Sequence, residues 1–396
     1  MLRRRSASLA GACTALLLAA LASPVSADEP APLGTIRGAD SPSAIEGSYI
    51  VVLKQDAPSA RKGKAKNLTA QFGGSVRRTF TSAFNGFTVE AKATEARRIA
   101  ADPSVAFVEQ NSVEYADATQ YSPTWGLDRI DQAKLPLSGS YSYATTASNV
   151  TAYIVDSGIR ITHGNFGGRA DYGYDFVDDD TIASDCNGHG THTAGTVGSS
   201  TYGVAKGVNL VAVRVLDCSG SGTTANVIAG YDWVAANAQL PAVANVSIGG
   251  SASAAKDAAV AGMVDAGVTV AVSAGNDAVN ACNQSPAREP SVITVASTTS
   301  ADARSSFSNY GTCVDIFAPG SSITSLGYSS DTATAVKNGT SMATPHVAGA
   351  AALYLADHPS ASPATVTAAI KSVATSGVVT SAGTGSPNLL LNVAGL

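Results

Sequence analysis

The segment Asn338-Gly339-Thr340-Ser341-Met342-Ala343-Thr344-Pro345-His346 places a serine after a Gly-Thr pair, directly before an apolar stretch at residues 347–355. The apolar stretch predicts a helix, so the hydroxyl oxygen of Ser341 should lie at a helix N-terminus. Backbone N–H groups and the positive end of the helix dipole can stabilise a developing negative charge there. A serine at a helix start is also a common N-cap, so this segment alone does not establish a catalytic site.

Two upstream segments add to this pattern. Val155-Asp156-Ser157-Gly158 ends an apolar, strand-like run, and Asn187-Gly188-His189-Gly190-Thr191-His192 follows it in the chain. Asp, His and Ser therefore occur in the chain order known for subtilisin. The three segments resemble the subtilisin-like serine proteases (subtilases). The wider sequence, over about residues 47–396, is most similar to the proteinase K and aqualysin branch of that family.

The resemblance implies a catalytic triad. A serine hydroxyl is a weak nucleophile, so it needs a base and a group that orients the base. By resemblance Ser341 is the nucleophile, His189 the base and Asp156 the orienting carboxylate. Taken singly, Asp156 could be a turn residue and His189 a packed loop histidine, but the three motifs together favour catalysis. We interpret His192 as structural, because no HExxH pattern or third metal ligand accompanies it.

The tetrahedral intermediate of acyl transfer also needs donors for its oxyanion. The backbone N–H of Ser341 is one candidate. Asn276 directly follows Gly275 after a strand-like run and resembles the oxyanion asparagine of the family. The alternative is a loop asparagine that favours a left-handed backbone.

Two glycine-rich segments resemble the strands between which subtilases bind an extended peptide, Ser219-Gly220-Ser221-Gly222 and Ser247-Ile248-Gly249-Gly250. By resemblance the second segment also forms one wall of the pocket for the residue before the scissile bond, and Ala274 with Gly275 forms the opposite wall. None of these positions is charged, so we expect protein and peptide substrates with apolar and aromatic residues before the scissile bond. The alternative is a pair of flexible loops.

From residue 149 onward, apolar strand-like runs alternate with helix candidates. This pattern predicts an α/β fold, with a parallel sheet covered by helices on both faces. Asp156, Asn276 and the segment at 247–250 fall at or just beyond strand ends, where sites in such sheets lie. The runs are strands at 150–155, 208–216, 242–248 and 268–273, with helices at 224–238 and 254–266.

The N-terminus begins Met-Leu-Arg-Arg-Arg, and an apolar run at 10–21 and small residues follow. This pattern predicts a secretory signal over residues 1–27, and the run is short for the alternative, a membrane anchor. We therefore expect a secreted, extracellular protein that no membrane retains after export. Residues 118–396 hold 11 Lys/Arg and 19 Asp/Glu, a net charge of −8, which argues against a nucleic-acid partner.

Residues 28–117 are predicted to be a propeptide, with an inhibitor-like domain at about 47–115, and residues 118–396 the peptidase domain. Strands at 48–54, 84–90 and 105–110 and helices within 57–73 and 94–101 give a βαββαβ-like plan. This plan resembles the inhibitor-type propeptide of subtilases, which implies a folding chaperone and inhibitor. The alternative is a small binding domain that stays attached. The mature N-terminus should lie at about residues 115–120.

Of five cysteines, Cys13 lies in the predicted signal, and an even number remains. An exported chain of this kind is expected to form two disulfides, and the sequence alone allows three pairings. The resemblance favours Cys186 with Cys218 and Cys282 with Cys313. It also implies a structural Ca²⁺ ion, bound by the carbonyls of Pro290 and Val292 and the Asp315 carboxylate, since mixed oxygen ligands suit this ion.

The sequence thus predicts a monomeric, self-processing zymogen of a secreted serine endopeptidase that acts through an acyl-enzyme. Two other functions remain open. An esterase or transacylase would use the same triad but would prefer simple esters over peptides. A catalytically silent binding or inhibitor protein would not react covalently at Ser341.

Overall fold

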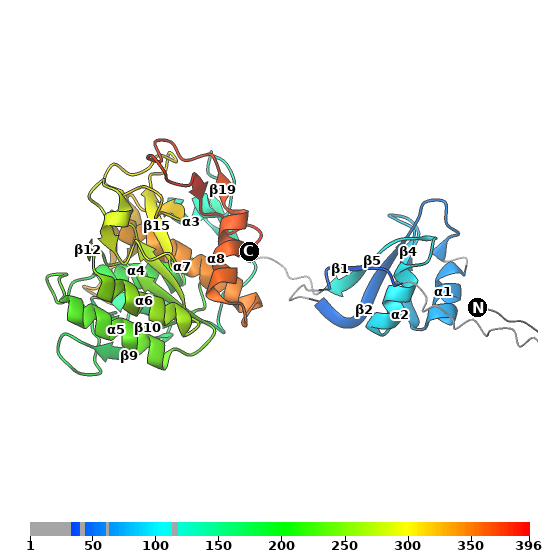
Figure 1. Cartoon of the computed structure of the whole chain (residues 1–396), viewed down its shortest axis with the longest axis horizontal. Coiled ribbons are helices and arrows are strands. Elements are labelled where there is room, and N and C mark those ends of the chain that lie inside the picture. Colours follow the sequence, from blue (N-terminus) through cyan, green and yellow to red (C-terminus); the bar gives the residue numbers. More distant parts are fainter. Residues whose placement is uncertain (1–32, 40–43, 61–62, 113–117) are drawn as a thin grey trace, which may run out of the picture. The chain divides into compact units, whose positions relative to one another are not determined.

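The computed structural model describes residues 33–39, 44–60, 63–112 and 118–396. The predicted signal peptide and Cys13 lie outside these ranges, as do residues 115–117 of the predicted cleavage region. The chain divides into two compact units, Met1–Val113 and Glu114–Leu396 (Figure 1). Each unit has its own hydrophobic core.

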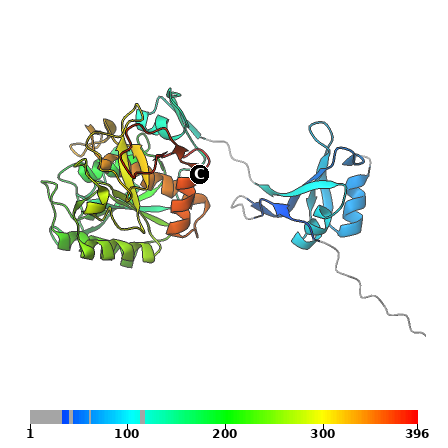
Figure 2. The ribbon, with the colours of Figure 1, turned by 45° about the horizontal axis from the view of Figure 1, so that its top comes forward.

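The smaller unit is a five-stranded sheet with two helices packed on it (Figure 2). Its helices are α1 (Lys64–Phe72) and α2 (Ala93–Ala100). Alternate residues of β2 are buried, and Val51 packs with Phe87, Ile99 and Val108 in one core. The strand order is β1 (Ile36–Arg37), β5 (Val105–Ser112), β2 (Ala44–Leu53), β4 (Gly86–Glu90) and β3 (Ser75–Phe80), and β1 and β3 were not predicted from the sequence.

The larger unit is built on a nine-stranded sheet. Neighbouring strands are parallel, except for the edge pair β19 and β20. The order is β19 (Thr375–Ser376), β20 (Leu389–Leu390), β16 (Ile316–Pro319), β15 (Ile293–Thr298), β13 (Thr269–Ser273), β11 (Ala242–Val246), β8 (Thr151–Asp156), β10 (Asn209–Arg214) and β9 (Ala170–Asp175).

Helices cover both faces of this sheet. On β8, Ala152 and Ile154 pack with α4 (His189–Gly198), α7 (Thr340–Asp357) and α8 (Pro363–Val373). Tyr153 and Val155 point to the other face, toward α5 (Thr224–Asn237) and α6 (Ala254–Asp265). This alternation follows from the pleat of a strand that is buried on both sides. The predicted α/β architecture is confirmed, and the bounds predicted for β8, β10, β11, β13, α5 and α6 differ from the observed ones by at most two residues.

Short elements and two disulfides complete the larger unit. Cys186 is bonded to Cys218 and Cys282 to Cys313, the pairing that the resemblance implies. In the part of the chain that the structure describes, no helix is long and apolar enough to cross a bilayer. The short elements are β6 (Ala118–Tyr121), α3 (Trp125–Ile130), β7 (Ser140–Tyr143), η2 (Gly164–Phe166), β12 (Gly250–Ser251), η3 (Ala281–Asn283), β14 (Gln284–Ser285), β17 (Ile323–Leu326) and β18 (Thr334–Lys337).

Candidate active site

Three elements bring the predicted triad to the carboxyl edge of the sheet. Asp156 is the last residue of β8, His189 the first of α4 and Ser341 the second of α7. The Nδ1 atom of His189 lies 2.7 Å from Oδ1 and 2.9 Å from Oδ2 of Asp156. The imidazole is therefore held at Nδ1, and the other ring nitrogen, Nε2, is left for chemistry.

Asp156 is fully buried, and its carboxylate has partners besides His189. Oδ1 accepts a hydrogen bond from the backbone N–H of Ser157 at 2.7 Å, and Oδ2 accepts one from Oγ1 of Thr193 at 3.4 Å. Donors to a buried carboxylate offset the cost of burying its charge. They also fix the carboxylate plane against the imidazole.

The environment sets the protonation of the histidines. Burial lowers the pKa of His189, but the charge and hydrogen bond of Asp156 raise it, so the net pKa lies above the ordinary 6.5. Burial lowers the pKa of His192 and of His346 to about 4. Both rings contact backbone carbonyls, those of Ile323 and Met342 respectively. His192 thus stays neutral and packed, in keeping with its structural interpretation.

The hydroxyl of Ser341 does not donate to His189. It donates to the carbonyl oxygen of Ser247 at 3.1 Å, and in the described structure no hydrogen bond joins Ser341 to His189. A change of the χ1 rotamer redirects a serine hydroxyl. Catalytic hydrogen bonds often tighten only when substrate binds, so this geometry is compatible with the predicted triad.

Ser247 also secures the main chain of Ser341. Pro345 lies four residues after Ser341 inside α7 and has no N–H to donate to the Ser341 carbonyl. The hydroxyl of Ser247 donates to that carbonyl at 2.9 Å, and Nδ2 of Asn245 donates to the Ser247 hydroxyl at 3.0 Å. A side chain from the segment at 247–250 thus replaces a missing helical hydrogen bond next to the predicted nucleophile.

Thr340 orients Asn276 over the start of α7. Oδ1 of Asn276 accepts hydrogen bonds from the backbone N–H of Thr340 at 2.8 Å and from its hydroxyl at 3.0 Å. Because both Thr340 groups are donors, the amide atom that faces them must be the oxygen, Oδ1. The amide nitrogen Nδ2 is therefore turned toward Gly339 and the helix N-terminus. The backbone N–H of Gly275 donates to the same Thr340 hydroxyl at 3.1 Å. Sequence reasoning did not identify this role of Thr340.

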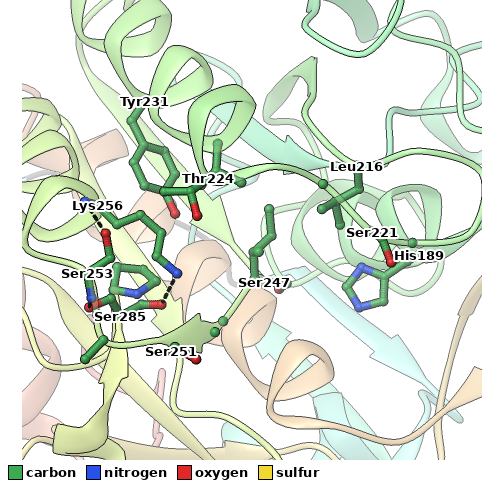
Figure 3. Close-up of a pocket in the computed structure, with 18 of the residues that line it drawn as sticks. His189, Leu216, Ser221, Thr224, Tyr231, Ser247, Ser251, Ser253, Lys256 and Ser285 are labelled. Atoms are coloured by element: carbon green, nitrogen blue, oxygen red, sulfur yellow. Dashed lines mark hydrogen bonds between the residues drawn. The ribbon is translucent and has the colours of Figure 1, made fainter.

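A pocket of about 680 Å³ joins the two glycine-rich segments (Figure 3). Both predicted segments, at 219–222 and 247–250, line it together with His189. Ala274 and Gly275 are not among its lining residues, because the Ala274 side chain packs in a core cluster with Ala281 and Phe317. Sequence reasoning did not identify the lining residues Thr224, Tyr231, Lys256, Ser285 and Pro286.

The carboxylate of the predicted calcium site has two partners. Oδ1 of Asp315 accepts from the ammonium of Lys371 at 2.9 Å, and Oδ2 accepts from the backbone N–H of Thr294 at 3.0 Å. Among the described residues, no group of three or more His, Cys, Asp or Glu side chains could hold a metal ion. A cation here would therefore need backbone carbonyls, such as those of Pro290 and Val292.

Comparison with known proteins identifies the family. The chain matches the subtilase family over residues 106–390 and the peptidase inhibitor I9 family over residues 48–116. The chain belongs to the subtilase family. An extracellular serine proteinase of Thermus sp. (strain Rt41A) is 50% identical over 397 residues, which cover 95% of this subtilase and 96% of that protein.

Two further comparisons agree with this assignment. Alkaline serine exoprotease A of Vibrio alginolyticus is 50% identical over 363 residues, 88% of this chain and 67% of that protein. The crystal structure of a cold adapted subtilisin-like serine proteinase superposes with a TM-score of 0.67 at 55% identity, covering 69% of this chain and 98% of that one. The predicted family, enzyme class and extracellular location are confirmed: this subtilase is a subtilisin-like serine endopeptidase with an I9 inhibitor domain.

Proposed function

We propose that Asp156, His189 and Ser341 form the catalytic triad of this endopeptidase. The observation that carries the proposal is the double contact of His189 Nδ1 with Asp156, at 2.7 and 2.9 Å, beside a serine at a helix start. Nε2 of His189 takes the proton of the Ser341 hydroxyl as Oγ attacks the substrate carbonyl. Asp156 keeps the imidazole in the required tautomer and stabilises the imidazolium that forms.

The tetrahedral intermediate then collapses. His189 returns the proton to the leaving amine, the C–N bond breaks and an ester to Ser341 remains. Water enters, gives a proton to His189 and attacks the ester, which releases the acid and restores the serine. We assign the backbone N–H of Ser341 and Nδ2 of Asn276 as the oxyanion donors. The contacts of Thr340 with Oδ1 of Asn276 support this assignment.

The substrate binds as an extended strand between the segments at 219–222 and 247–250. Support comes from the position of both segments on one pocket with His189. The residue before the scissile bond then lies against the segment at 247–250, which bears no charge. We infer broad acceptance of apolar and aromatic residues at that position; the proposed opposite wall, Ala274 and Gly275, does not line this pocket.

The precursor carries a signal over residues 1–27 and a propeptide over 28–117, ahead of a monomeric peptidase domain at 118–396. The I9 match at 48–116 supports an inhibitory propeptide, and we propose that it also assists folding. Self-cleavage near residues 115–120 would release the mature enzyme. Because the division into units at 113 and 114 lies just before this region, each product keeps its own core.

We also propose a structural calcium site formed by Pro290, Val292 and Asp315. The three oxygen donors fit Ca²⁺ in their chemistry. Lys371 is the competing cation, because it already contacts Oδ1 of Asp315. This side chain is 37% exposed and can leave the carboxylate for solvent when an ion binds.

The test compares the wild type with Ser341→Ala on an unfolded protein substrate, with intact masses recorded for both chains. Cleavage and self-processing by the wild type alone are expected. Stoichiometric labelling of Ser341 by a phosphonyl fluoride would exclude a silent binding protein, and higher activity on simple esters than on peptides would favour an esterase. A folded, processed wild type that cleaves no protein would contradict the proposal.

A further inference from the structure

The pocket contains a buried cation that the catalytic mechanism does not use. Lys256, in the first turn of α6, is only 8% exposed and lines the pocket together with the segment at 247–250. Its ammonium donates to the carbonyl oxygen of Ser285 at 3.2 Å. An ammonium has three N–H donors, so this contact leaves capacity for further acceptors. Burial of a lysine is costly unless such acceptors are supplied.

A second polar group in the same pocket is also left without a partner. The Tyr231 side chain, from α5, is fully buried, and its hydroxyl makes no hydrogen bond in the described structure. Figure 3 shows this hydroxyl and the Lys256 ammonium directed into the pocket from the two neighbouring helices. Buried polar groups in native proteins usually have hydrogen-bond partners. Two hydrogen-bond donors with free capacity in one pocket indicate that a bound ligand supplies the acceptor for both.

The charge around Lys256 is not balanced from within the pocket. Among the residues that the structure describes, no Asp or Glu lines it. The adjacent Asp257 is paired with Arg288, whose Nε lies 2.6 Å from its carboxylate. Burial lowers the pKa of Lys256, and the charge of Asp257 raises it in part. Among the described residues, no hydrogen bond or ion pair joins Lys256 to Asp257, so N–H donors of the ammonium remain for an incoming carboxylate.

The backbone gives the position of this cation relative to the scissile bond. Ser247 lies beside the nucleophile, since it accepts the hydroxyl hydrogen bond of Ser341. Gly250 lies beside Lys256, because a Cβ atom at Gly250 would be 3.2 Å from the ammonium nitrogen. Three strand residues span about 10 Å. We align an extended substrate so that the residue before the scissile bond lies beside Ser247. The fourth residue before that bond then lies beside Gly250, and its side chain reaches Lys256.

We propose that this subtilase selects an acidic side chain at the fourth residue before the scissile bond, held by the Lys256 ammonium and the Tyr231 hydroxyl. This inference rests on the proposed endopeptidase function and on substrate binding along the segment at 247–250. It adds a second determinant to the apolar preference at the residue before the scissile bond. A charge-assisted pair of hydrogen bonds discriminates against the neutral isostere, glutamine.

The test uses acetylated tetrapeptide p-nitroanilides of sequence X-Ala-Ala-Phe, with X as Glu, Gln or Leu. Enzyme processed from the full chain should cleave the Glu peptide with a kcat/KM roughly tenfold above that of the Gln peptide. A second series, Ala-Ala-X-Phe, should show no such ratio. Cleavage of none of these peptides would count against the proposed function itself. Cleavage with a Glu/Gln ratio of one or less at the first position would overturn the inference alone.

Matched variants test whether Lys256 and Tyr231 cause the preference for the Glu peptide over the Gln peptide. Lys256→Met should bring the Glu/Gln ratio to about one, and Tyr231→Phe should lower it in part. Lys206→Met is the control, because Lys206 is a similarly buried lysine, 9% exposed, that does not line the pocket. Active enzyme is counted in each variant by phosphonyl fluoride labelling, so partial misfolding does not alter the ratio. A Glu preference that persists in Lys256→Met would contradict the assignment.

Discussion

At the scale of single residues, Ser247 couples the segment at 247–250 to Ser341, the proposed nucleophile of this subtilase. Its carbonyl accepts from the Ser341 hydroxyl, and its own hydroxyl donates to the Ser341 carbonyl. The second contact exists because Pro345 leaves that carbonyl without its helical partner. Loss of the Ser247 hydroxyl therefore leaves the buried Ser341 carbonyl without this hydrogen-bond donor.

We predict that Ser247→Ala lowers the free energy of unfolding by about 1–3 kcal/mol, the cost of one buried unsatisfied polar group. The measurement is thermal unfolding in a Ser341→Ala background, which prevents self-digestion and keeps the carbonyl. In Pro345→Ala the helix regains an N–H for the Ser341 carbonyl, so Ser247→Ala should cost less there. If Ser247→Ala lowers the free energy of unfolding equally with Pro345 and with Ala at this position, the Ser247 hydroxyl and the restored N–H of residue 345 do not share the Ser341 carbonyl.

A second prediction concerns pH. As the proposed base, His189 must be neutral to accept a proton, and the Asp156 carboxylate raises its pKa above 6.5. The acid limb of kcat/KM should thus lie above pH 6.5 in the wild type. Asp156→Asn removes the charge, so the limb should shift to lower pH and kcat should fall by about 10⁴-fold. Asp171→Asn, on the exposed outer strand β9, is the control, and an unshifted limb in Asp156→Asn would contradict the proposed role of the carboxylate.

Short sequence motifs predicted the triad and Asn276. Contacts that form only in the folded chain could not be predicted from the sequence. Thr340 stands inside the serine motif, but its role depends on Asn276, 64 residues away. Lys256 follows an Ala-Ala pair and has the sequence pattern of an exposed helix lysine. Only the packing of α6 against α5 brings its ammonium to a pocket. Long-range contacts of this kind carry no local sequence signal.

At the scale of elements, burial decided which strands were predicted. All five residues of β11 and of β13 are buried, and such short, largely apolar runs are a clear signal. By contrast, β3 reads Ser-Val-Arg-Arg-Thr-Phe and has no fully buried residue, so its sequence lacks the alternation of a half-buried strand. Pairing with β4, rather than propensity, makes this segment a strand.

The contact between α8 and the residue before β16 gives a prediction about calcium. Lys371→Met frees Oδ1 of Asp315 from its competing cation, so Ca²⁺ should raise the melting temperature more in this variant than in the parent. The ion pair is partly exposed, so its loss without calcium should cost at most about 1 kcal/mol. Calorimetry of the Ser341→Ala protein with calcium or a chelator measures both effects. If calcium stabilises Asp315→Asn as much as the parent, the ion binds elsewhere and the proposed site is wrong.

At the scale of the whole molecule, two separate cores imply two folding units. The core of the smaller unit includes Val51, Phe87 and Val108, and its members among the described residues all belong to the smaller unit. The division by contacts falls at residues 113 and 114, close to the predicted end of the propeptide at 117. A cut in this region would leave the core residues of each unit together in one product.

The last prediction follows from this independence. A separately produced segment of residues 28–117, added to processed enzyme, should inhibit cleavage of a Phe anilide at an equimolar ratio, and inhibition should fade as the enzyme degrades it. Phe87→Asp in the segment buries a charge in its core, so this variant should neither fold nor inhibit. Glu90→Gln is the matched control, because Glu90 is exposed at the end of the same strand. Circular dichroism establishes folding and initial rates establish inhibition. A folded segment that leaves the initial rate unchanged would contradict an inhibitory propeptide and favour a small domain with another partner.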